Sequence, residues 1–150
     1  MNGGVLCSYT TTSVDIETTS GAYRTTPFGG RDVVLERRTA EGRRLSATYV
    51  GSSADDDALS VTSDPDGSVI VVFRTTSTNF ASTATVEYDD DGTDRVVVMR
   101  LDSTLSTVIS SLQFVTEKKL HVNHTVVRSD GSVVMAGTTD DEKIQTSPTA

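Results

Sequence analysis

The stretch Asp66-Gly67-Ser68-Val69-Ile70-Val71-Val72-Phe73 decides the fold, because the chain contains two related copies of its opening. Asn2-Gly3-Gly4-Val5 precedes it by 64 residues, Asp130-Gly131-Ser132-Val133 follows it by 64 residues, and each opens a hydrophobic run. Similarity at a fixed spacing of this size is typical of an array of small structural units that stack on one another. The sequence therefore predicts about two and a quarter repeats of about 64 residues.

The residues around this stretch predict antiparallel strands. An Asp-Gly pair between two hydrophobic runs favours a β-hairpin, and we expect Asp66 and Gly67 to form a type I′ turn in which both residues have positive φ. The runs 69–73 and 96–99 are apolar throughout, which indicates strands that are covered on both faces. The alternation in 45–49 instead indicates a half-exposed strand. A radial array of small antiparallel sheets contains both kinds of strand.

This reasoning predicts an all-β chain, a β-propeller segment built of four-stranded antiparallel blades, with no helix. Residues 1–57 would form a partial blade with a long Thr/Ser-rich loop, 58–114 a complete blade with a long inserted loop, and 115–150 a second partial blade. Strands are expected near 5–9, 32–38, 44–50, 58–62, 69–74, 95–101, 107–114, 121–127 and 132–137.

Two long loops interrupt the pattern, one from Thr10 to Gly30 and one from Thr75 to Gly92. Loops of this length are unusual in a compact unit. We expect isolated hydrophobic residues such as Ile16 and Phe80 to pin them onto the blades. The alternative is that the loops bind a ligand.

Composition excludes several classes of function. The 24 Thr and 18 Ser residues, with 5% aromatics, suit strands and turns. A net charge of -8 argues against a nucleic-acid partner, and no segment reaches the ~18 apolar residues that a membrane span needs. The single cysteine, Cys7, excludes a disulfide within the chain and is expected to be a small buried hydrophobe. Arg37-Arg38 and Arg43-Arg44 are expected to form a solvated hairpin surface.

Candidate sites are weak. The acidic runs Asp55-Asp56-Asp57 and Asp89 to Asp94 suggest Ca²⁺, for which Asp89, Asp91 and Asp94 are the weak candidates, although acidic residues also form solvated turns. Apart from Ca²⁺ we expect no cofactor. Asn123 begins an Asn-His-Thr glycosylation sequon. We find no nucleophile with a base beside it and expect no catalysis.

Several landmarks together resemble the SBBP β-propeller repeat. They are Gly21-Ala22-Tyr23, Gly29-Gly30-Arg31-Asp32, Ala47-Thr48-Tyr49-Val50-Gly51, Asp64-Pro65-Asp66-Gly67 and Thr75-Thr76-Ser77-Thr78-Asn79-Phe80. The second unit departs from the pattern at Ser111-Leu112-Gln113-Phe114-Val115 and at Glu117-Lys118-Lys119. The resemblance implies a propeller in large, mostly secreted or surface-attached proteins, and it supplies no catalytic motif.

We therefore expect a non-catalytic structural or protein-interaction module of an extracellular or cell-surface assembly. Its partners would be the remainder of a longer propeller chain, or neighbouring chains that complete its first and last blades. The alternatives are a glycan- or ligand-binding propeller module and an accessory propeller domain of a secreted hydrolase. A repeated scaffold without converging catalytic residues favours the first interpretation.

Overall fold

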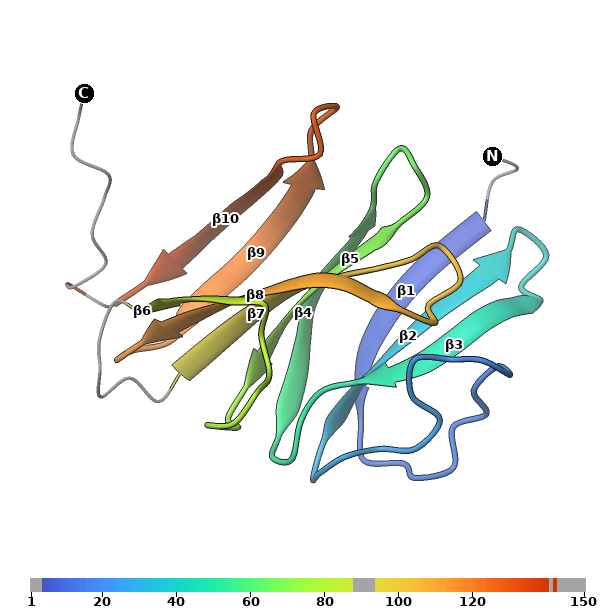
Figure 1. Ribbon diagram of the computed structural model, residues 1–150, viewed down its shortest axis with the longest axis horizontal. Coiled ribbons are helices and arrows are strands. Elements are labelled where there is room, and N and C mark those ends of the chain that lie inside the picture. Colours follow the sequence, from blue (N-terminus) through green and yellow to red (C-terminus); the bar gives the residue numbers. More distant parts are fainter. Residues whose placement is uncertain (1–3, 88–93, 141, 143–150) are drawn as a thin grey trace.

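A computed structural model describes residues 4–87, 94–140 and 142 of the chain, and they form ten β-strands and no helix (Figure 1). The strands are β1 (Gly4–Thr11), β2 (Asp32–Thr39), β3 (Arg44–Val50), β4 (Asp56–Ser63), β5 (Val69–Thr75), β6 (Ala84–Glu87), β7 (Asp94–Leu101), β8 (Val108–Thr116), β9 (Leu120–Val127) and β10 (Val133–Thr139). The all-β prediction is confirmed, and nine of the ten strands lie where the sequence predicted one. Within the described residues, no helix has the length and apolar character needed to cross a membrane.

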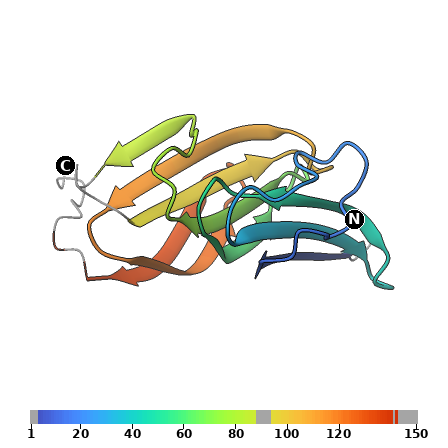
Figure 2. The same cartoon turned by 90° about the horizontal axis from the view of Figure 1, so that it is seen from below.

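The strands form three sheets, which we call the N-terminal sheet (β1-β2-β3), the central sheet (β4-β5-β7-β8-β6) and the C-terminal sheet (β10-β9). Figures 1 and 2 show the sheets side by side, with the central sheet between the other two. None of them closes into a barrel. The central sheet contains the expected four antiparallel strands, β4, β5, β7 and β8, in chain order.

The fifth strand of the central sheet is a correction to the sequence prediction. Strand β6 lies within the segment predicted to be a loop, and it pairs in parallel with the outer edge of β8. Thr83 explains its position, because the Thr83 backbone N–H donates to the carbonyl of Ser111 over 3.0 Å and its Oγ1 also bonds Ser111. Strand β6 has four residues and follows an exposed, Thr-containing segment, so its pattern is too short for a strand to be recognised in the sequence.

The 64-residue repeat is present in the strand pairing as well as in the sequence. The pair β9–β10 repeats the pair β4–β5, and each contains one unpaired bulge residue, Leu59 in β4 and Asn123 in β9. Strand β2 pairs with β1 and β3 as β7 pairs with β5 and β8. The N-terminal sheet is therefore equivalent to β5-β7-β8, and the C-terminal sheet is equivalent to β4-β5.

The hairpin between β4 and β5 is confirmed, but its predicted type I′ turn is wrong. The Gly67 N–H donates to the carbonyl of Asp64, and only Gly67 in this turn has a positive φ, of 89°. This is a type I turn followed by a left-handed glycine. Pro65 suits the first central position of this turn because its ring fixes a negative φ, although Ser129 at the equivalent position forms the same turn. Gly131 repeats the geometry with a φ of 81°.

Two hydrophobic cores hold the three sheets together. The larger core lies between the N-terminal and central sheets and consists of Leu6, Val33, Leu35, Val50, Ala58, Val61, Val69, Val71, Phe73, Phe80, Val97, Met99, Leu101, Leu105 and Val108. Phe80 packs edge-on against Phe73 with ring centroids 5.6 Å apart, so the loop after β5 is pinned as the sequence predicted. The smaller core lies between the central and C-terminal sheets, where Val72, Val96 and Val122 are buried.

An arginine fastens each sheet to the hairpin of the next. Arg37 of β2 donates to the carbonyl oxygen of Gly67 over 3.2 Å, and Arg100 of β7 donates to the carbonyl oxygen of Gly131 over 3.3 Å. The two arginines are equivalent, because Arg37 pairs opposite Leu6 and Arg100 pairs opposite Ile70, 64 residues later. The second sheet-to-sheet contact therefore repeats the geometry of the first.

Candidate docking surfaces

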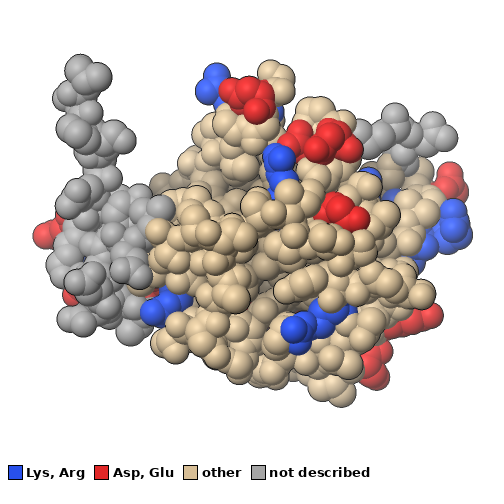
Figure 3. Space-filling view, viewed as in Figure 1, with Lys and Arg blue, Asp and Glu red and all other residues tan. Residues whose placement is uncertain are grey.

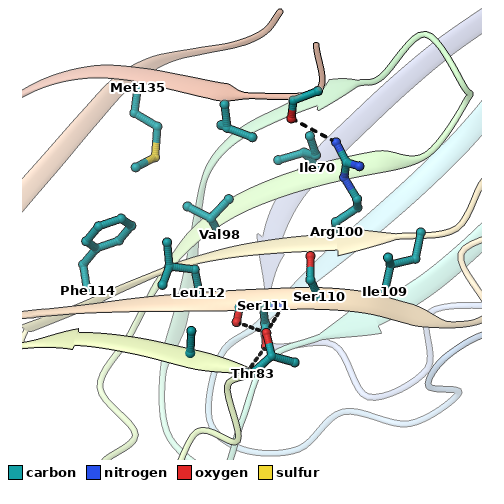
Figure 4. Close-up of a pocket in the computed structure, with 13 residues that line it drawn as sticks. Ile70, Thr83, Val98, Arg100, Ile109, Ser110, Ser111, Leu112, Phe114 and Met135 are labelled. Carbon is teal, nitrogen blue, oxygen red and sulfur yellow. Dashed lines mark hydrogen bonds between the residues drawn. The ribbon is translucent and has the colours of Figure 1, made fainter.

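An apolar groove of about 550 Å³ lies between the central sheet and β10. The face of the central sheet that carries Ile70 and Val98 forms its floor, and β10 forms one side. In Figure 4 the side chains of Met135, Phe114, Leu112 and Val98 surround the space between these elements. The lining residues are Ile70, Thr83, Ala84, Val98, Arg100, Ile109, Ser110, Ser111, Leu112, Phe114, Gly131, Val133 and Met135.

The repeat explains why this groove is open. The equivalent face of the N-terminal sheet contains Leu35 and Val50, which are fully buried beneath the face of the central sheet that carries Met99 and Leu101. Within the described residues, the C-terminal sheet contains no strands that correspond to β7 and β8. Ile109, which lines the groove, is the bulge residue of β8 and is 53% exposed, as Leu45 is 50% exposed at the equivalent bulge of β3. Among the described strands, the groove therefore lies where equivalents of β7 and β8 would pack.

A smaller cavity of about 270 Å³ adjoins Gly137 of β10. Phe114, Leu120, Val122 and Met135 line it together with residues 136–139. Gly137 is equivalent to Phe73 of β5 and to Tyr9 of β1, so an aromatic ring is missing at this position. A Cβ atom on Gly137 would lie 1.8 Å from the carbonyl oxygen of His121, so β10 cannot carry a side chain here without moving.

The outward face of the N-terminal sheet is the second incompletely covered surface. It carries Val5, Cys7 and Tyr9, which are equivalent to Val69, Val71 and Phe73 on the face of the central sheet that forms the larger core. Val5 is 54% exposed, whereas Val69 is fully buried. By its place in the repeat, this face is therefore equivalent to a surface that packs against another sheet.

Glu36 forms the centre of a charged cluster on this same face. Its carboxylate accepts a hydrogen bond from the Tyr9 hydroxyl over 2.9 Å, and it pairs with Arg38 at 2.6 Å and with Arg44 at 3.0 Å. Cys7 donates its thiol to the backbone carbonyl of Glu36 over 3.7 Å. The prediction that the arginines form a solvated surface is therefore wrong for Arg38 and Arg44, because a carboxylate that is 2% exposed holds both of them.

The cluster shifts three pKa values. Burial alone would raise the pKa of Glu36, but hydrogen bonds from Tyr9 and Arg38 and the charge of Arg44 outweigh it, so this pKa lies below its usual value. Burial, with the hydrogen bond and the charge of Glu36, raises the pKa of Tyr9 to about 12. Burial and the same carboxylate raise the pKa of the Cys7 thiol. Cys7 is half-buried rather than buried, and its raised pKa makes it a poor nucleophile at neutral pH.

A pair of buried carboxyl groups, those of Asp32 and Asp56, flanks Gly51. Asp32 accepts hydrogen bonds from the backbone N–H groups of Phe28 and Gly29, and Asp56 accepts one from Ser52 over 2.7 Å. A Cβ atom at Gly51 would lie within 3.0 Å of an oxygen of each carboxyl group. Burial raises the pKa of Asp56 to about 6, with Asp32 and Asp55 adding to the rise and hydrogen bonds from Thr75 and Ser52 opposing it. These groups hold the start of β2 and β4 in place.

Of the three weak calcium candidates, the structure describes Asp94 alone. Asp89 and Asp91 lie outside the described residues, and Asp94 pairs with Arg74 at 2.9 Å and accepts a hydrogen bond from the Leu120 N–H. In the other acidic run, Asp55 and Asp57 both pair with Arg31. In the described part of the chain, no three His, Cys, Asp or Glu side chains are grouped so that they could hold a metal ion.

The remaining candidate residues lie at turns or on the surface. Asp66, Gly67, Asp130 and Gly131 form the two equivalent hairpin turns, whereas Asn2 and Gly3 lie outside the described residues. The sequon residue Asn123 is the exposed bulge residue of β9. Figure 3 shows acidic side chains over the hairpin ends and largely uncharged surface over the middle of the molecule.

Sequence reasoning did not identify the groove residues. The sequence patterns place Ile109, Leu112, Phe114 and Met135 in strands, and they mark Leu112 and Phe114 only as departures from the repeat landmarks. The repeat could have identified them, because it shows that no equivalents of β7 and β8 follow β10 in the described residues.

No protein-family model matches the chain, and no curated protein matches it significantly. The resemblance to the SBBP repeat thus rests on the landmark residues alone.

Proposed function

We propose that this chain is a non-catalytic structural or protein-interaction module of an extracellular or cell-surface assembly, built from propeller-type repeat units. The observation that carries the proposal is the unequal coverage of two equivalent surfaces. The face of the N-terminal sheet that carries Leu35 is fully covered, whereas the equivalent face of the central sheet opens into the groove. A groove of this shape and apolar character suits another β-sheet as its occupant.

The described side chains offer more support for a scaffold than for a ligand-binding loop. The hydroxyl of Tyr49 donates to the carbonyl of Ser13 and accepts from the N–H of Ile16, which holds the first long loop against the N-terminal sheet. Thr19 of the same loop bonds Ala47 of β3. Most of these polar groups are therefore occupied within the chain.

An apolar dye that fluoresces in hydrophobic surroundings tests whether the groove accepts a partner. We expect the dilute chain to bind the dye, and we expect Ile109→Arg to abolish the binding because it places a charge in the groove. Val14→Arg is the matched control, since Val14 is 76% exposed in a loop away from the groove. Dye binding that Ile109→Arg leaves unchanged would contradict the proposal. A saturable signal on a glycan array would also contradict it and would favour the ligand-binding alternative.

A further inference from the structure

The repeat identifies what the C-terminal sheet lacks. Strands β9 and β10 are equivalent to β4 and β5, and within the described residues no equivalents of β7 and β8 follow them in this sheet. The N-terminal sheet has the other strands of the unit. Among the described residues it contains the equivalents of β5, β7 and β8 but no equivalent of β4. Each incomplete sheet therefore supplies what the other needs.

Strand β10 fills its position poorly. Its residues are exposed or half-buried throughout, whereas six of the seven residues of the equivalent β5 are buried. Gly137 leaves the cavity of about 270 Å³ at the position where β5 carries Phe73. Strand β1 carries Tyr9 at this position, and Tyr9 is only half-buried in its own sheet. The half-buried ring of Tyr9 therefore occupies the position in the repeat at which the cavity beside Gly137 has no side chain.

We propose that the chain associates head to tail with a second copy of itself, in which the N-terminal sheet of the second copy replaces β10 beside β9. Tyr9 of the second copy would fill the cavity now beside Gly137, and its β2–β3 hairpin would cover the groove along Ile109 and Leu112. This inference rests on the proposed function, for which it names the partner.

The polar groups and the loop of the second copy are compatible with this arrangement. Glu36 is equivalent to Met99 in the larger core, and it is already buried and paired with Arg38 and Arg44, so docking would bury no unpaired carboxylate. The loop after β1 begins as the loop after β5 does, because Ser13 bonds Thr11 as Ser77 bonds Thr75. The loop after β5 already fits between two sheets in the larger core.

The association is heterologous, because the two surfaces that meet are different. Each copy would contribute two complete four-stranded units, one of its own and one shared with the next copy. Head-to-tail contacts of this kind close into a ring or continue as a filament. A ring of three or four copies would contain about six or eight units, which is within the usual range of four to eight propeller blades.

The pairing register provides a specific test. Thr125 of β9 pairs opposite Met135 of β10, and residue 7 is equivalent to residue 135. Thr125 would therefore pair opposite Cys7 of the second copy. Within one chain these residues lie in different sheets, with the central sheet between them, so no intramolecular disulfide can join them.

We expect mild oxidation of the full-length Thr125→Cys variant to give a ladder of covalent oligomers on a non-reducing gel. Mass spectrometry should identify the peptide that links residue 7 to residue 125. Cys7→Ser in the same background should abolish the ladder. His124→Cys is the matched control, because residue 124 lies on the opposite face of β9 and should give none. Adding Ile109→Arg to Thr125→Cys should also reduce the ladder.

Three outcomes would overturn the head-to-tail arrangement. They are the absence of a ladder, a ladder equally strong with His124→Cys, and dimers that persist after Cys7→Ser. The dye experiment separates this failure from failure of the proposed function. If Ile109→Arg abolishes dye binding but Thr125→Cys does not cross-link, the groove accepts a partner other than this chain. If neither effect occurs, both proposals fail.

Discussion

The two contacts between sheets are built on one plan, but only one of them is complete. Between the N-terminal and central sheets, Arg37 holds the Gly67 turn above a continuous core that includes Phe73. Between the central and C-terminal sheets, Arg100 holds the Gly131 turn in the same way, yet the core beneath it has only three buried residues, Val72, Val96 and Val122. The hairpin and the arginine are therefore enough to orient a sheet, whereas coverage depends on the third and fourth strands.

The largest expected effect compares aromatic residues in the two contacts. Phe73→Ala should lower the free energy of unfolding by about 3–5 kcal/mol, because it opens a cavity in the complete core. Phe114→Ala, beside the open groove, should cost about 1–2 kcal/mol, since Phe114 is only half-buried. Urea unfolding followed by circular dichroism measures both values. Equal losses would mean that the groove is covered in solution.

The Glu36 cluster distinguishes the N-terminal sheet from the central sheet, which has Met99 at the equivalent position. Glu36→Gln should lower the free energy of unfolding by about 1–3 kcal/mol, because Arg38 and Arg44 lose their buried carboxylate partner. Urea unfolding at neutral pH measures the loss. Glu17→Gln is the control, since Glu17 pairs with the same Arg44 but its side chain is 90% exposed. A similar loss in both variants would show that burial of Glu36 contributes nothing.

Asp56 should make the anchored start of β4 sensitive to pH. Its pKa of about 6 in the folded chain lies above the usual value of about 3.9, so the folded state binds the proton more tightly. The resulting stability is fully present below about pH 4 and is lost as the pH rises through about 6. Asp56→Asn should therefore be more stable than wild type by about 1–2 kcal/mol at pH 7, with the difference shrinking at pH 4. Thermal unfolding at both values checks this, and a difference that is independent of pH would refute it.

The smallest expected effect compares the two hairpin glycines. Gly67→Ala and Gly131→Ala should each cost about 1 kcal/mol locally, because both positions require a positive φ. We expect only Gly67→Ala to lower the global stability by this amount. Gly131→Ala should instead reduce amide protection in β9 and β10, because this sheet can open separately from the rest. Hydrogen exchange would show the difference, and a global loss in both variants would mean that the C-terminal sheet unfolds with the rest.

The sequence predicted the strands well because their signals are local. Apolar runs such as 69–73 and turn residues such as Gly67 depend on a few neighbouring positions, and the spacing of 64 residues placed the equivalents. The predicted turn type was wrong because the turn runs over four residues, from Asp64 to Gly67 and from Arg128 to Gly131, and not over the Asp-Gly pair alone. Strand β6 could not be predicted because it is short and its partner β8 lies far away in the sequence.

The docking surfaces were harder to predict because they are defined by what does not cover them. Ile109 is 53% exposed at a bulge of β8, and Leu45 is 50% exposed at the equivalent bulge of the covered N-terminal sheet, so exposure alone does not mark the groove. Nothing in the sequence around Glu36 indicates a buried charged cluster. Its partners Tyr9 and Arg44 come from β1 and β3, the strands on either side of it. Pairing of this kind becomes visible only once the strand register is known.

Hydrogen bonds from two threonines, at the outer edges of β3 and β8, limit where another strand can pair with these sheets. Thr19 bonds Ala47 of β3 as Thr83 bonds Ser111 of β8, so in two successive sheets the chain itself occupies the backbone groups at this rim. A strand edge that is already occupied cannot recruit a foreign strand. At Ala47 and Ser111 the backbone groups are therefore closed to a foreign strand, which favours growth by stacking of sheets over lateral pairing at these two positions.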